Sequence, residues 1–374
     1  MTLCGSSGCG APRPPLRQAA GRYTTYALLL WSIESGIPVI IIVRIIVFSE
    51  GKMRIKANIC YNLDVLCFIN IMTADKYYVN FHKELFDKYY PLINKDTKQD
   101  IQAMIKEQGY SMLSPTLTLF VSSLPNFENE NLVELLGNRT EIEYFMNKTP
   151  YDFSQKRFDF YFKYITSAII PLIKELENAG LSVFWTENKF PLIKERCEKI
   201  NEYLKRYEIE HLINQFKDFD SSDFTVYLGS FVKPHGIKLC GNNLISDISY
   251  SDKDILSNVT HEAFHPAFDF DVVKPYLNKL AKIPWVKHAF DNQNPNSGYY
   301  SIDGFIEEHI VEALGIYVLT RLGVDINPAE YFKAHDEGSH VISPYFYEYL
   351  CEIKKEPTES FESYFTKFVD TIDE

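Results

Sequence analysis

The sequence predicts an α+β protein that is mainly helical, with one small sheet in its second half. Between residues 77 and 217, apolar and aromatic side chains recur at steps of three and four, the period of helices with one buried face. Between residues 224 and 248, short apolar alternations are interrupted by Pro, Gly and Asn, which is typical of strands joined by turns. With 374 residues, of which 46% are hydrophobic, the chain can bury a large core in one large domain or two packed ones.

The composition disfavours several classes of function. Acidic residues outnumber basic ones by 50 to 38, and the net charge of −12 opposes binding to a phosphate backbone. We therefore expect no nucleic-acid partner. The seven cysteines are scattered and form no C-x-x-C pair, so neither a disulfide framework nor a cysteine-based zinc site is predicted. This pattern is typical of a reducing compartment.

Residues 1–52 differ in composition from the rest of the chain. Their apolar residues between 27 and 48 form two runs, and Arg44 interrupts the second, so neither run reaches the roughly 20 apolar residues of a spanning helix. The segment is interpreted as a membrane anchor or export signal, as a strand over residues 39–47, or as a misassigned start with translation beginning at Met53. A start near Met53 is favoured and predicts a cytoplasmic protein. Membrane association is expected only if the segment is real.

The body of the chain divides into two regions. Residues 53–220 form a mainly helical half, in which long helices are expected over residues 152–179 and 192–216. Gly180 directly follows the first of these helices, where glycine commonly ends a helix. Residues 221–374 begin with the small sheet and continue with further helices.

The motif that carries chemistry follows the predicted sheet. Ser251 is a typical helix N-cap with acidic residues in the first turn, and the helix is expected to continue to His265. Residues 261–265 read H-E-A-F-H, an H-E-x-x-H motif. Histidines four residues apart lie on one face of a helix, so both imidazoles can bind one Zn²⁺ at ~2.0–2.1 Å. Glu262 then lies beside a zinc-bound water, whose pKa falls towards ~7, and accepts its proton.

A hydrolytic zinc site needs a third protein ligand. An extended H-x-x-G-x-x-H motif is absent, since no Gly or His follows His265 at the required positions. The segment 304–319 is a predicted helix that is apolar on nearly every side, and acidic residues are costly to bury there unless they are paired or bind a metal. Glu308 is the predicted ligand and Glu307 is the alternative.

Two further residues of this helix have expected roles. Glu312 lies four residues after Glu308, so one carboxylate can bind zinc while the other accepts the outer N–H of a ligating histidine. A solvated charge is the alternative interpretation of Glu312. Gly315 lacks a side chain and would permit a close approach to the neighbouring helix.

The order of these motifs resembles a known clan of zinc enzymes. H-E-A-F-H is followed, 43 residues after His265, by Glu308 in E-H-I-V-E-A. This arrangement is similar to the gluzincin clan of metallopeptidases, and more closely to bacterial minigluzincin-like domains of unknown function, from about residue 59 to the end of the chain. The resemblance implies a zincin-like catalytic region with one Zn²⁺ per chain, held by His261, His265 and Glu308, with Glu262 as the base.

The resemblance also implies a group that stabilises the oxyanion. Larger peptidases of the clan use a Tyr or His of a C-terminal helical subdomain, and this chain has no unambiguous counterpart. Such a donor is worth about 3–4 kcal/mol. The candidates are His335, His340, Tyr299 and Tyr300. His340 is favoured as a catalytic residue because Gly338 indicates a loop that can bring it over the zinc.

The sequence thus predicts a zinc metallopeptidase that hydrolyses peptide bonds through a zinc-bound water activated by Glu262. A peptide or protein substrate would add a strand to the edge of the sheet. A second hypothesis is a non-catalytic zinc-containing interaction module. A complete H-E-x-x-H motif disfavours it, because structural zinc sites usually have four protein ligands. A third hypothesis is a helical protein without metal, in which the motif is accidental.

Overall fold

The computed structural model of the protein describes residues 23–31, 38–46, 55–149, 153–217, 223–234, 236–293, 301–334 and 338–372. Residues 1–52 and residues 53–374 form separate units. In the first unit, strands β1 (Tyr23–Trp31) and β2 (Pro38–Ile46) pair antiparallel. The strand interpretation of residues 39–47 agrees with this pairing. Over the described ranges, no helix combines the length and the apolar character that crossing a membrane requires.

The first half of the second unit consists of helices around an apolar core. These elements are α1 (Tyr61–Met72), α2 (Lys76–Phe81), α3 (Lys83–Tyr89), η1 (Tyr90–Leu92), α4 (Lys95–Gln108), α5 (Ser114–Ser122), α6 (Leu132–Gly137), α7 (Arg139–Met146), α8 (Gln155–Tyr164), η2 (Ile165–Ile169), α9 (Ile170–Asn178), α10 (Leu181–Asn188), α11 (Phe190–Leu204) and α12 (Ile209–Ile213). The helix expected over residues 152–179 is present as α8, η2 and α9 without a break. Gly180 follows it with φ +82°, as predicted for a glycine that ends a helix. The helix expected over residues 192–216 is interrupted after Leu204.

A small sheet lies between the two groups of helices. Its strands are β3 (Ile55–Asn58), β4 (Phe224–Gly229), β5 (Ile237–Lys238) and β6 (Asn243–Asp247), in the order β3-β4-β6-β5. Strands β3, β4 and β6 are parallel, and β5 runs antiparallel to β6 at one edge. Strand β4 is buried along its whole length. The sequence prediction missed β3, because four residues directly before a helix give too few alternations to be recognised.

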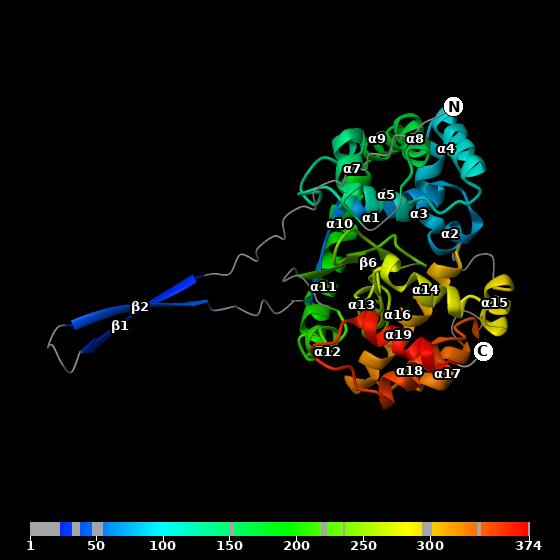
Figure 1. The fold of residues 1–374 in the computed structure, drawn as a ribbon. Coiled ribbons are helices and arrows are strands. Elements are labelled where there is room, and N and C mark those ends of the chain that lie inside the picture. Colours follow the sequence, from blue (N-terminus) through cyan, green and yellow to red (C-terminus); the bar gives the residue numbers. More distant parts are fainter. Residues whose placement is uncertain are drawn as a thin grey trace, which may run out of the picture. The chain divides into compact units, whose positions relative to one another are not determined.

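The second half of the unit consists of helices that follow the sheet. They are α13 (Asp252–Glu262), α14 (Phe270–Leu280), α15 (Pro284–Asp291), α16 (Ile302–Arg321), α17 (Pro328–Ala334), α18 (Ser343–Glu352) and α19 (Phe361–Thr371). Figure 1 shows α13, α14, α16, α18 and α19 packed together in yellow to red, with α4, α8 and α9 at the other end of the unit, β6 between, and the green helices α11 and α12 alongside the sheet and the later helices. The prediction of a mainly helical α+β protein is confirmed.

Helices α13 and α16 approach each other closely at Gly315. A Cβ atom at this position would lie 3.4 Å from both the Cα and the backbone N of His261. A larger side chain would therefore press on the backbone of the motif helix. The predicted close approach at Gly315 is confirmed, and it brings the glutamates of α16 to the histidines of α13.

Candidate metal centre

Helix α13 presents the first half of the motif. It begins with a capping box, in which Asp254 N–H donates to Ser251 Oγ (3.1 Å) and Ser251 N–H donates to Asp254 Oδ2 (3.2 Å). Its apolar residues Ile255, Leu256 and Val259 are fully buried, which fixes the rotation of the helix. The opposite side of its last turn therefore presents the motif to the neighbouring helix α16.

The helix ends earlier than predicted. Its last α-helical residue is Glu262, and His265 lies in the turn that follows. In this turn the Phe264 N–H donates to the backbone oxygen of His261 (3.0 Å), three residues earlier. An α-helical bond would reach back four residues, so the backbone is wound more tightly here. The expected helix to His265 is thus wrong in its last turn, although His265 still reaches the same place as His261.

Two lysines bind the backbone oxygens that the early end of α13 leaves open. Lys238 Nζ donates to Glu262 O (2.7 Å), and Lys217 Nζ donates to Ala263 O (3.1 Å) and His265 O (2.9 Å). Burial, reinforced by the charge of Lys238, lowers the pKa of Lys217 to about 7, and burial also lowers the pKa of Lys238. Positive groups are favourable at the C-terminus of a helix, so the pair stabilises the turn that carries His265.

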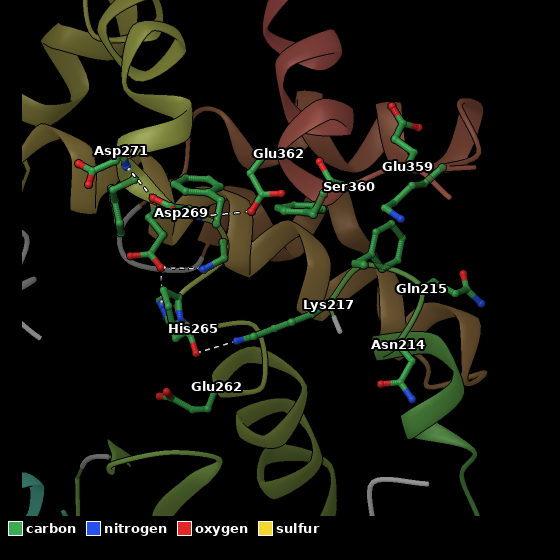
Figure 2. Close-up of a pocket in the computed structure, with 18 of the residues that line it drawn as sticks. Asn214, Gln215, Lys217, Glu262, His265, Asp269, Asp271, Glu359, Ser360 and Glu362 are labelled. Carbon is green, nitrogen blue, oxygen red and sulfur yellow. Dashed lines mark hydrogen bonds and ion pairs between the residues drawn. The ribbon is translucent and has the colours of Figure 1, made fainter. Parts of the chain in front are cut away.

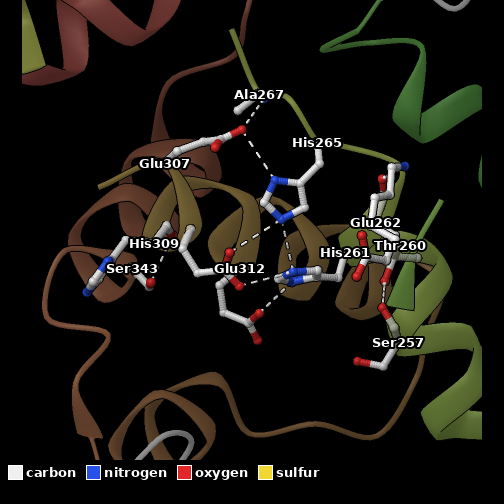
Figure 3. A network of polar contacts seen from close by, with 12 residues as sticks. Ser257, Thr260, His261, Glu262, His265, Ala267, Glu307, His309, Glu312 and Ser343 are labelled. Atoms are coloured by element: carbon white, nitrogen blue, oxygen red, sulfur yellow. Dashed lines mark hydrogen bonds and ion pairs between the residues drawn. The ribbon is translucent and has the colours of Figure 1, made fainter. Parts of the chain in front are cut away.

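Three side chains converge between α13 and α16. His261 Nε2 lies 3.2 Å from His265 Nε2 and 3.1 Å from Glu308 Oε1, and His265 Nε2 lies 3.4 Å from Glu308 Oε2. Figure 3 shows the two imidazoles facing each other in front of α16. Among the described residues, these three form a set of His, Cys, Asp or Glu side chains that could hold a metal ion.

The outer nitrogen of each histidine contacts a second carboxylate. His261 Nδ1 lies 2.7 Å from Glu312 Oε2, and His265 Nδ1 lies 3.3 Å from Glu307 Oε1. The same oxygen of Glu307 accepts a hydrogen bond from Ala267 N–H (2.9 Å). Because a carboxylate only accepts, each Nδ1 donates its N–H to a carboxylate, and each Nε2 is the nitrogen that gives up its proton when the imidazole becomes neutral. Glu307 therefore lies behind His265 rather than with the three convergent side chains.

The carboxylates dominate the electrostatics of the cluster. Burial alone lowers the pKa of His261, but Glu308 and Glu312 raise it well above its ordinary value. Burial also lowers the pKa of His265, but Glu307 and Glu308 outweigh it and raise this pKa to about 9. Burial raises the pKa of Glu308, whereas the two histidines lower it well below its usual range. Three carboxylates around two imidazoles make this a site that attracts a cation.

Glu262 lies beside the cluster in the wall of a cavity of about 1150 Å³. Figure 2 shows Glu262, His265 and Lys217 at one side of this cavity. Within the described part of the chain, Glu262 Oε2 is buried and accepts no hydrogen bond. A buried carboxylate oxygen of this kind is rare unless it serves a ligand or a bound water. The remaining wall comes from Lys238, Glu307, the loop after α12, the loop after His265 and the segment around the start of α19.

The structure does not bring His340 to the three convergent side chains. His340 is 1% exposed and packs against His309, with ring centroids 5.1 Å apart, and it does not line the cavity. The other candidates for oxyanion stabilisation, His335, Tyr299 and Tyr300, lie outside the described residues.

Sequence reasoning missed both lysines at the end of α13. Lys217 belongs to a loop and Lys238 to a strand of two residues, and neither position follows a spacing that points to the motif. The only available signal was indirect: a helix that ends on a functional turn leaves carbonyl groups that need donors.

Comparison of the chain with family models, curated proteins and solved structures returned no significant match.

Proposed function

We propose that the protein is a zinc-dependent metallopeptidase. His261, His265 and Glu308 would hold one Zn²⁺ per chain, and Glu262 would act as the general base. The observation that carries the proposal is the spacing of the three convergent side chains. Atoms placed tetrahedrally at ~2.0–2.1 Å around zinc are about 3.3–3.4 Å apart. The two Nε2 atoms are 3.2 Å apart, and Glu308 lies 3.1 Å from His261 Nε2 through Oε1 and 3.4 Å from His265 Nε2 through Oε2, all close to this value.

The second carboxylates support the same proposal. Glu312 and Glu307 fix the tautomers in which each Nε2 offers its lone pair, which is how zinc-binding histidines are usually held. Three protein ligands leave one tetrahedral position for water or substrate, as in catalytic rather than structural zinc sites. The geometry therefore favours hydrolysis over a closed structural site.

Glu262 has the position that a general base needs. A bound zinc would supply Lewis acidity, lowering the pKa of water and polarising a carbonyl group. The carboxylate of Glu262 faces the cavity next to His265 and would accept the proton of the attacking water. The same carboxylate would then return this proton to the leaving amine as the peptide bond breaks. Its buried, unpaired Oε2 is free for this exchange.

Strand β5 provides an edge on which a peptide can lie. Leu239 N–H donates to Asn243 O (3.0 Å), so Leu239 faces β6 and its neighbour Lys238 turns its N–H and C=O away from β6. Cys240 shows the same outward orientation, because its N–H donates to Ser122 Oγ on helix α5. We propose that an extended substrate pairs with the backbone of Lys238, directly beside Glu262.

The test compares Glu262→Gln with the parent protein. The variant should keep one zinc per chain by elemental analysis and lose peptide hydrolysis by about 100-fold or more, because a glutamine side chain cannot accept the proton. Glu134→Gln, at an exposed position of α6, is the control and should keep both properties. Unchanged hydrolysis by the Glu262→Gln variant would rule out the proposed base. A zinc-loaded parent that cleaves no member of a peptide library would favour the non-catalytic interaction module instead.

A further inference from the structure

The inner end of the cavity contains an ammonium group that forms no ion pair. Lys238 Nζ donates to the backbone oxygen of Glu262 and lies 5.4 Å from the centre of the Phe224 ring. Among the described residues, no carboxylate lies within ion-pair distance of this nitrogen, and those of Glu262 and Glu307 act on it from farther away. An ammonium group has three N–H donors, and this hydrogen bond uses one of them. A largely buried charge without a close counter-ion is costly.

Most of the carboxylates around the same cavity already have partners. Glu307 accepts hydrogen bonds from the loop after His265, Asp269 caps helix α14, and Glu359 pairs with a lysine at 2.7 Å. Glu362 accepts a backbone N–H at 3.4 Å. Figure 2 shows Asp269, Glu359 and Glu362 on the opposite side of the cavity from Glu262. These carboxylates therefore do not neutralise the ammonium group of Lys238 at the inner end of the cavity. A bound ligand can supply the missing negative charge.

We propose that the cavity beside Glu262 binds a carboxylate of the substrate through the ammonium group of Lys238. This inference rests on the proposed peptidase function and specifies its substrate class: peptides that carry a carboxylate next to the bond to be cleaved.

The position of Lys238 explains why the carboxylate must lie near that bond. Its backbone N–H and C=O face away from β6, where the substrate is expected to pair, while its side chain reaches the end of α13 at Glu262. A substrate residue that pairs at this edge would thus direct its own side chain, or a chain end, into the cavity. The carboxylate can belong to an acidic side chain or to a free C-terminus, and both offer the same chemistry to an ammonium group.

Three uncleavable probes distinguish these two sources. Each is a short peptide capped with a hydroxamate, which binds zinc directly. The first probe has a glutamine side chain and a C-terminal amide, the second replaces the glutamine by glutamate, and the third keeps glutamine but has a free C-terminal carboxylate. Their dissociation constants are measured by calorimetry on the full-length, zinc-loaded protein. We expect the second or the third probe to bind at least about tenfold more tightly than the first.

The outcomes separate the inference from the proposed function. Tighter binding of the glutamate probe identifies an acidic side chain, and tighter binding of the free-acid probe identifies a C-terminus. Equal binding of all three probes overturns the inference and leaves the zinc site intact. Failure of the neutral probe to bind overturns the zinc site, and the inference with it.

Variants assign the effect to one side chain. Lys238→Met should bind the three probes with equal affinity, whereas Lys238→Arg should keep the preference for a carboxylate because it keeps the charge. Lys253→Met is the matched control, because Lys253 donates to a backbone oxygen at 2.6 Å at the other end of α13, outside the cavity. A preference that persists in Lys238→Met would place the receptor elsewhere and contradict the inference. The three-probe comparison on the parent protein stands even if Lys238→Met fails to fold.

Discussion

His261 Nδ1 lies 2.7 Å from Glu312 Oε2, although 51 residues separate the two in the chain. Helix α16 therefore supplies two carboxylates with different positions. Glu308 faces the inner nitrogens of the two histidines, and Glu312 accepts from the outer nitrogen of His261. Glu312 is 4% exposed, and this contact explains how its charge is buried in an apolar helix. Of the two interpretations of Glu312, the hydrogen-bond partner agrees with the structure and the solvated charge does not.

Replacing Glu312 should weaken zinc binding without removing a ligand. Glu312→Ala leaves the Nδ1 of His261 without its acceptor, and loss of such a partner typically lowers metal affinity by about 10- to 100-fold. Competition with a chromophoric chelator measures this change. Asp303→Asn is the control on the same helix, because it breaks only a surface ion pair with Lys274. Equal zinc affinities of the Glu312→Ala and parent proteins would contradict the proposed role.

Replacing the two adjacent glutamates should give different results. Glu308→Gln should lose stoichiometric zinc, because its carboxylate lies against both Nε2 atoms. Glu307→Gln should keep zinc at reduced affinity, because Glu307 contacts the outer nitrogen of His265 and the N–H of Ala267 rather than the inner nitrogens. Elemental analysis after dialysis distinguishes the two. Zinc lost with Glu307 but retained with Glu308 would exchange their roles.

The motif residues could be predicted from the sequence, but the assignment of their neighbours required the structure. The spacing of His261 and His265, and the burial of α16, follow from helical periodicity and from the cost of burying charge. Glu307 and Glu308, in contrast, are consecutive and point about 100° apart on the helix. Which of them meets both histidines depends on where the turn after α13 places His265, and this turn departs from the expected helix.

The fold, too, could be predicted from the sequence only in part. The mainly helical class follows from the three- and four-residue steps of the apolar side chains, which extend over many turns. Strand β3 is held by pairing with β4, which is distant in the chain, and its four residues have no pattern of their own. The two-residue strand β5 pairs with β6, the next strand, and lies in the region of predicted apolar alternation, but nothing in its sequence points to the motif. Lys238, which belongs to β5, could not be connected to the motif for this reason.

Side chains at position 315 should disturb the metal centre through the helix contact. Gly315→Val adds three carbons where a Cβ atom alone already lies 3.4 Å from the backbone of His261. We expect a loss of about 1–3 kcal/mol in the free energy of unfolding, together with weaker zinc binding, because α13 must move away from α16. Gly137→Val is the matched control, since a Cβ there meets nothing within 4 Å. Similar losses in both variants would show that the effect is only one of helix propensity.

Asp64 should make the stability of the protein depend on pH at a place remote from the metal centre. This fully buried carboxyl accepts hydrogen bonds from Trp185 Nε1 (2.7 Å) and from the backbone N–H groups of Ser230 (2.8 Å) and Phe231 (3.0 Å). Burial outweighs these three donors and raises its pKa from 3.8 to about 6. Between these two values the folded protein holds a proton that the unfolded chain has released. Its contribution to stability is therefore greatest below about pH 4 and is lost as the pH rises through 6.

The variant Asp64→Asn isolates this contribution, because asparagine does not titrate. We expect the variant to be less stable than the parent at every pH. Its NH₂ group cannot accept the hydrogen bonds that the carboxyl group of Asp64 accepts, so a donor would face a donor. The advantage of the parent over the variant should then shrink by up to about 3 kcal/mol between pH 4 and pH 7. Urea unfolding of both proteins across this range measures the difference, in which the other titrating groups cancel. An advantage that grows with pH would mean that the three donors outweigh burial and hold the pKa of Asp64 below 3.8.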